Sequence, residues 1–276
     1  MQATAATTLQ NRDPSEQARM RALVRFNPLT FHSLAAASFL ETAVPAQVNR
    51  IARLFAAYPD VRLWLEQTWW PQRAELGRAL RGYVEATWPE FDWHAAYQEF
   101  YGTYDPRSGL ESGRGHAALE ALALCVTAAQ AALFYRAWAA CAEEPGLRAL
   151  ARRAANEHAA YFDFFRALFE RCKRSGRVGV IAAWRAVTAT CRSVRDVDVP
   201  AAFQPLERNW SGAAIAPVLT YPEYQSKMAH LVQRHATVGP AQRLLFRPWL
   251  KRAALARVTP PPSRPRGGLR IVPQTA

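Results

Sequence analysis

Two stretches of the chain have residue types and spacings from which paired helices build a metal site. The first covers residues 69–84 (WWPQRAELGRALRGYV), and the second covers residues 154–165 (AANEHAAYFDFF). In four-helix bundles that hold two irons, Glu-x-x-His on each of two helices directs a carboxylate and an imidazole toward one interior point. Side chains three residues apart lie on the same face of a helix. The two stretches therefore predict a pair of facing helices.

Most of the metal ligands are replaced in these two stretches. Arg73 and Leu76 stand at the Glu and His positions of the first frame, and Glu157 and Ala160 stand at those of the second. Only Glu157 keeps a side chain that can bind a metal. The pattern therefore favours a bundle that has lost iron chemistry, with no catalytic residue, no bound metal and no cofactor.

The first stretch shares six residues with the pattern W-T-A-E-E-x-R-H-G-x-A-L-R-x-Y-L, whereas Gln72, Arg73 and Leu76 depart from it. The six are Trp69, Gly77, Ala79, Leu80, Arg81 and Tyr83. The second stretch resembles I-A-A-D-E-x-x-H through Ala154, Ala155 and Glu157, with Asn156 and Ala160 as departures. Both patterns are those of soluble acyl-acyl carrier protein desaturases in the ferritin-like superfamily, and the resemblance extends over roughly residues 40–240.

Two further positions follow from this resemblance. Residues 41–45 (ETAVP) are similar to the family's E-E-A-L-P, with Thr42 where the ligand Glu of the first helix would stand. The register ahead of Phe134 and Tyr135 places Ala128 at the Glu position of the remaining ligand helix. The resemblance implies an all-α, ferritin-like helical bundle with additional C-terminal helices. It also implies a homodimer and an acidic carrier protein as partner. Two aromatic clusters are expected either in the core or along a cavity for an acyl or other apolar ligand, and they comprise Trp69, Trp70, Tyr161, Phe162, Phe164 and Phe165.

The helices that must position these residues follow from apolar spacing and from Pro and Gly breaks. With 276 residues, half of them hydrophobic, the chain can bury one substantial core. We expect a flexible segment over residues 1–18, a helical domain over 19–258 and a disordered Pro/Arg-rich tail over 259–276. Helices are predicted over residues 45–57, 60–86, 95–101, 116–142, 146–173, 178–192, 223–235 and 241–258. Pro71 should kink or restart the second helix, and residues 200–221 read mostly as loop.

Glu157 and Arg73 form the structural pair that we expect to replace the metal. In the register of the resemblance, Glu157 points into the bundle, where an isolated carboxylate would be costly. Arg73 occupies the corresponding position on the partner helix, and its planar guanidinium can hold a carboxylate through two hydrogen bonds. The alternative is that these helices are rotated and that both side chains lie in solvent.

A rearranged metal site is a second alternative. His116 and Glu120 are four residues apart on one predicted helix face, and Glu157 with His158 could approach from the next helix. Such a site would bind iron or manganese and would make the protein an active di-metal oxidoreductase. His158 is turned about 100° from Glu157 around the helix, which weakens this assignment.

The formal charge of +13, which comes almost wholly from arginine, predicts attraction to acidic partners. Nucleic acid is a disfavoured partner, because no zinc finger or other recognition motif accompanies the charge. No stretch has the length and composition of a transmembrane segment, since residues 117–142 contain Glu120, Gln130 and Arg136. The N-terminus lacks the order of a secretory signal, so we expect a cytoplasmic protein.

The sequence therefore predicts a desaturase-related, non-catalytic or accessory protein. The rearranged di-metal oxidoreductase is one alternative, and an arginine-rich nucleic-acid-associated protein is the other. No nucleophile elbow or phosphate-binding loop supports a further enzyme class. The substrate or ligand, the pathway and the identity of any partner do not follow from the sequence.

Overall fold

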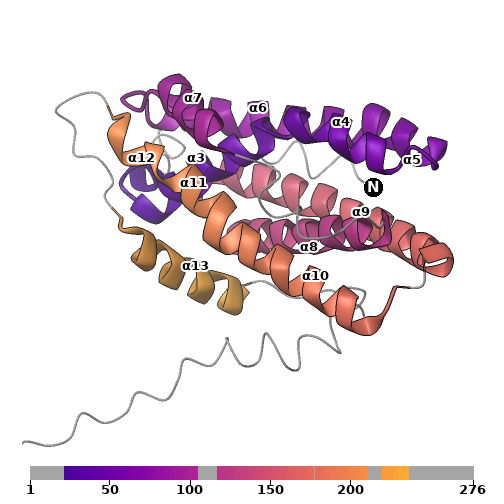
Figure 1. Cartoon of the computed structure of the whole chain (residues 1–276). Coiled ribbons are helices and arrows are strands. Elements are labelled where there is room, and N and C mark those ends of the chain that lie inside the picture. The colour runs from indigo at the N-terminus through magenta and orange to yellow at the C-terminus, as the bar shows by residue number, and fades with distance from the viewer. Residues whose placement is uncertain (1–21, 105–116, 177, 211–218, 236–276) are drawn as a thin grey trace, which may run out of the picture. The chain divides into compact units, whose positions relative to one another are not determined.

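The protein is all-α, as predicted. The computed structural model describes residues 22–104, 117–176, 178–210 and 219–235, and the regular elements within these ranges are helices (Figure 1). An isolated β-bridge joins Phe91 to Trp210. The described residues belong to one compact unit. The predicted end segments, the predicted helix over 241–258 and the candidate ligand His116 lie outside the described residues.

The bounds of the helices agree with most of the predicted ranges. The elements are α3 (Pro28–Thr42), α4 (Pro45–Leu54), α5 (Pro59–Trp64), η1 (Leu65–Trp69), α6 (Trp70–Thr87), α7 (Trp93–Thr103), α8 (Ala117–Cys141), α9 (Pro145–Gly176), α10 (Val180–Ser193), η2 (Val194–Asp198), α11 (Val199–Phe203), α12 (Pro205–Arg208) and α13 (Tyr221–His235). Helix α3 was not predicted. The prediction of a loop over residues 200–221 is wrong in its first part, where α11 and α12 lie.

Helix α3 begins at a well-formed cap and is buried around most of its circumference. The side chain of Asn27 accepts hydrogen bonds from the amides of Leu29 and Thr30, and Pro28 occupies the first turn, where a proline needs no donor. Because residues on all sides of α3 are buried, its sequence has no alternation between apolar and polar faces. This is why the apolar spacing did not reveal the helix.

Helix α3 packs closely against α6 at Gly77. A Cβ atom added to Gly77 would lie 2.9 Å from Thr42 Oγ1 and 3.1 Å from the backbone nitrogen of Thr42. Only glycine therefore lets the two helices approach to this distance without a shift of the backbone. The contact brings the C-terminal end of α3 beside the first turns of α6.

Pro71 restarts the second predicted helix, which is one of the two outcomes that were expected. The π-helical turn η1 ends at Trp69, and the amide of Trp70 donates to the carbonyl of Leu65, five residues back. Pro71 has no amide hydrogen and lies in the first turn of α6, which explains why the α-helical pattern resumes there. A second π-helical turn, η2, joins α10 to α11.

Helices α8 and α9 are antiparallel neighbours, as their short connection predicted, and they pack together over much of their length (Figure 1). Glu144 begins α9 by accepting hydrogen bonds from the amides of Gly146 and Leu147. Helices α10 and α13 also pack on α8, and α6 contacts α9. By length and composition α8 could cross a membrane, although most of that segment is buried inside the protein.

Candidate functional site

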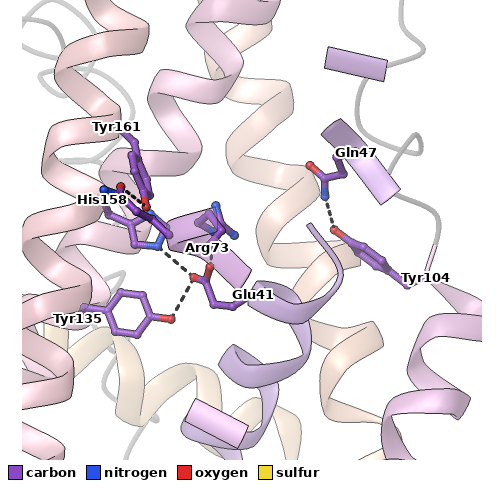
Figure 2. A network of polar contacts seen from close by, with 8 residues as sticks. Glu41, Gln47, Arg73, Tyr104, Tyr135, His158 and Tyr161 are labelled. Atoms are coloured by element: carbon purple, nitrogen blue, oxygen red, sulfur yellow. Dashed lines mark hydrogen bonds and ion pairs between the residues drawn. The ribbon is translucent and has the colours of Figure 1, made fainter. Parts of the chain in front are cut away.

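A buried carboxylate at the end of α3 joins side chains from three other helices. Glu41 is only 4% exposed. One of its oxygens, Oε1, lies 3.0 Å from His158 Nε2 on α9 and accepts a hydrogen bond of 3.1 Å from the hydroxyl of Tyr135 on α8. The other oxygen forms an ion pair with Arg73 on α6 (Figure 2). We call Glu41, Arg73, Tyr135 and His158 the Glu41 cluster.

The neighbours of Glu41 keep it ionised despite its burial. Burial acts to raise the pKa of Glu41, but the charge of Arg73 and the contacts with His158 and Tyr135 lower it to about 2. Burial lowers the pKa of His158, so this imidazole is neutral at pH 7. His158 Nε2 must then carry the ring proton and donate it to the ionised carboxylate. Burial raises the pKa of Tyr135 well above its usual range.

Aromatic rings hold the Glu41 cluster in place. The ring of His158 stacks on Tyr135 with centroids 5.4 Å apart and meets the edge of Tyr161 at 5.3 Å. The Tyr161 hydroxyl donates to Gln72 Oε1 at 3.1 Å. The guanidinium of Arg73 lies 5.6 Å from the ring centroid of Trp69. These contacts fix the rotamers of the side chains that surround Glu41.

Arg73 has a buried carboxylate partner, but this partner is Glu41 rather than Glu157. Glu157 forms its ion pair with Arg153 one turn earlier on the same helix, at 2.7 Å. No ion pair joins Arg73 to Glu157 within the part of the chain that the structure describes. The reason is the rotation of α9, whose inward residues are His158 and Tyr161, whereas Ala160 is exposed. The α9 side chain that points into the bundle is therefore that of His158, one position after the expected Glu157.

The other frame positions lie on α3, α6 and α8. Leu76 is fully buried in the core one turn after Arg73. Thr42 faces Gly77 at the contact between α3 and α6. Ala128 is buried on α8 and lines a cavity. Leu76 and Ala128 have no electron pair to donate to a metal ion, and Thr42 supplies a neutral hydroxyl in place of a carboxylate.

The described residues of the rearranged metal site, Glu120, Glu157 and His158, each have another partner. Glu120 is buried and forms an ion pair of 3.1 Å with Arg50 on α4, while Glu157 binds Arg153 and His158 binds Glu41. Among the described residues, no three His, Cys, Asp or Glu side chains are grouped so that they could hold a metal ion. His116 is not among the described residues.

A cavity of about 250 Å³ lies beside the Glu41 cluster. Its wall is largely apolar and includes Ala36, Ala37, Ala128 and Ala131, whose small side chains leave the space open. Both π-helical turns contribute to it, η1 through Trp69 and η2 through Val194 and Asp198. Polar wall residues include Gln47 and Tyr104, which hydrogen-bond to each other at 3.1 Å (Figure 2).

Glu41, Tyr135 and Asp198 were not identified as site residues from the sequence. Glu41 precedes the position that the resemblance singled out, Thr42, by one residue, so a shift of register would have found it. Tyr135 served only to mark the register of its helix. Asp198 lies between two predicted elements and belongs to no motif.

Comparison with known proteins gives no match among family models, curated proteins or solved structures.

Proposed function

We propose that the protein is a ferritin-like bundle that has lost a di-metal centre and holds a small apolar or amphipathic ligand in the cavity. The observation that carries this proposal is the Glu41 cluster, which joins α3, α6, α8 and α9 at the wall of that cavity. A non-catalytic or accessory role follows. The net charge of +13 supports an acidic macromolecular partner, such as a carrier protein, for the same molecule.

Charge balance supports the loss of the metal centre. Where carboxylates of a bundle hold two irons, the cations neutralise them. Here the guanidinium of Arg73 neutralises Glu41 and occupies a position that the resemblance gives to a metal ligand. Leu76, one turn further along α6, has no electron pair to donate. Restoring a single ligand would therefore leave the opposing positive charge in place.

The size and lining of the cavity support a ligand of modest length. A volume of about 250 Å³ is slightly below the usual range for drug-sized ligands. If each heavy atom needs roughly the 25–30 Å³ that a water molecule takes up in the liquid, about eight to ten such atoms fit. The alanine wall and the rings of Trp69 and Phe134 suit a short hydrocarbon chain.

The chemistry of the wall supports binding rather than catalysis. His158 Nε2 donates its proton to the ionised Glu41, and the other oxygen of Glu41 pairs with Arg73, so this carboxylate is not free to act as a base. His158 Nδ1 has no partner among the described residues. The thiol of Cys125 is buried, and burial raises its pKa to about 12, which disfavours a nucleophilic thiolate. No described cysteine or serine has a context that would activate it.

Binding of 1-octanol, together with metal analysis, tests this proposal. We expect saturable binding by calorimetry that is lost in Ala131→Leu, which fills the cavity. The matched control Ala159→Leu makes the same change on α9, away from the cavity wall. Purified protein supplied with iron or manganese should not bind two metal ions per chain. Stoichiometric metal that is lost on changing Glu120, or octanol binding that survives in Ala131→Leu, would contradict the proposal.

A further inference from the structure

The charges at the cavity wall are balanced except at one residue. Arg73 is paired with Glu41, and Arg50 is paired with Glu120, so both arginines of the wall are already bound to buried carboxylates. Asp198 lies at the end of η2 and forms no hydrogen bond or ion pair with any described residue. The carboxylate of Asp198 is therefore an unpaired charge that a ligand in the cavity would contact.

A second polar group of the wall is also without a partner, and it too is an acceptor. Gln130 Oε1 on α8 is buried and accepts no hydrogen bond within the described part of the protein. Arg50 Nε likewise lacks an acceptor, but the charge of this guanidinium is balanced by Glu120. Among the described wall residues, the unpaired acceptors are therefore the Asp198 carboxylate, Gln130 Oε1 and His158 Nδ1, and no cation is unpaired.

Asp198 is held in a position that is costly without a ligand. Burial alone raises its pKa to about 6, and no neighbouring charge contributes. Asp198 is half-buried and has no partner among the described residues, and an ionisable group in such a setting at a cavity wall is a candidate ligand contact. The π-helical turn η2 also supports a binding role for Asp198, since π turns inserted between α-helices occur frequently at functional sites.

We propose that the ligand is a small amphipathic amine, whose ammonium group binds the carboxylate of Asp198 and whose hydrocarbon part lies against the alanine wall. Gln130 Oε1 is a further acceptor on the same wall. An ammonium group supplies up to three donors and the missing positive charge. A carboxylic acid would instead place a second negative charge in a cavity without a free cation. This inference rests on the proposed function and specifies its ligand.

Three probes with the same chain length separate the two proposals. Calorimetry at pH 7.5 would compare octylamine, 1-octanol and octanoate, which are cationic, neutral and anionic at this pH. We expect octylamine to bind at least about tenfold more tightly than 1-octanol, as a charged hydrogen bond allows, and octanoate to bind most weakly. Asp198→Asn should remove the preference for octylamine and change 1-octanol binding by less than about twofold.

Asp196→Asn is the matched control, because Asp196 belongs to the same π turn but pairs with Arg195 and does not line the cavity. It should keep the preference for octylamine. If Asp198→Asn does not fold, Gln130→Met should lower octylamine affinity several-fold and leave 1-octanol binding unchanged.

Each remaining result has a distinct meaning. Equal binding of octylamine and 1-octanol, or tightest binding of octanoate, overturns the amine proposal and leaves the apolar cavity in place. Failure of all three probes to bind overturns the proposed function itself.

Discussion

Two carboxyl groups of the cavity wall, the buried Glu41 and the half-buried Asp198, are in opposite states. Glu41 is surrounded by Arg73, Tyr135 and His158, and these neighbours lower its pKa to about 2. No described residue places a charge beside Asp198, and burial raises its pKa to about 6. Burial penalises both carboxylates, so the neighbours decide which of the two is readily ionised. The charge of Glu41 is therefore satisfied within the protein, whereas that of Asp198 is left for a ligand.

This contrast separates stability from binding. The Glu41 cluster links four helices and has no charge left to offer a ligand, so we expect its loss to unfold the protein. Asp198 is not part of such a network, so we expect its loss to change binding and to relieve a cost in the folded state. The predictions below test this division.

The largest effect is expected from Arg73→Met, which leaves the carboxylate of Glu41 buried without its counter-charge. We expect a loss of about 3–5 kcal/mol in the free energy of unfolding, measured by urea denaturation. Arg62→Met is the control, because Arg62 pairs with Glu66 on the surface and should contribute less than about 1 kcal/mol. Adding Glu41→Gln to Arg73→Met should restore part of the loss; equal stability of the single and double variants would contradict a buried charge pair.

Asp198→Asn should act in the opposite direction and stabilise the protein at pH 7.5. The folded-state pKa of Asp198 is about 6, above its ordinary value of 3.8, so the folded protein holds this proton more tightly than the unfolded chain. Wild-type stability therefore falls as the pH rises from about 4 to 6, and the deficit of up to about 3 kcal/mol persists above this range.

The Asp198→Asn variant has no carboxyl group at this position, so its stability lacks this pH dependence. Urea denaturation of both proteins from pH 4 to 8 should show a difference that is small at pH 4 and reaches its maximum above pH 6. A difference that stays constant with pH would mean that Asp198 is not the titrating group.

Two glycines of α6 test the helix contact that brings Glu41 and Arg73 together. Gly77→Ala gains helix propensity but places a Cβ within 3.2 Å of the backbone of Glu41 and Thr42, so we expect a net loss of about 1–2 kcal/mol. Gly82→Ala meets no atom within 4 Å and should stabilise by roughly 0.5–1 kcal/mol. Thermal unfolding of the two variants should therefore shift in opposite directions.

The sequence predicted the parts of this arrangement that follow from periodicity and breaks. The antiparallel α8 and α9 were expected because a Pro-Gly pair at 145–146 separates two long apolar helices. Helix α3 was missed because it is buried on all sides and lacks an amphipathic period. Helices α11 and α12 lie largely in a stretch that was predicted as loop, and Pro200 and Pro205 each lie in the first turn of a helix, where a proline is tolerated.

The site was predicted only in outline. A buried arginine on α6 paired with a carboxylate was expected, and Arg73 has such a partner. The partner differs because the rotation of α9 is set by the packing of Tyr161, Phe162 and Phe165, which are buried together. Ligand spacing alone carries no information on that packing. The unpaired Asp198 could not be recognised either, since its lack of partners is a property of the folded chain.

The smallest effect is expected from Glu157→Ala. This variant compares Glu157, the carboxylate that the resemblance selected, with Glu41, the carboxylate that the helices bury. The side chain of Glu157 is 15% exposed and pairs with Arg153, which is 42% exposed and also binds Glu75. Arg153 therefore keeps a partner and stays in contact with water when Glu157 is removed. We expect a loss of about 0.5–1 kcal/mol by urea denaturation, against about 3 kcal/mol or more for Glu41→Ala. Similar losses for the two variants would mean that Glu157, and not only Glu41, belongs to the buried charge network.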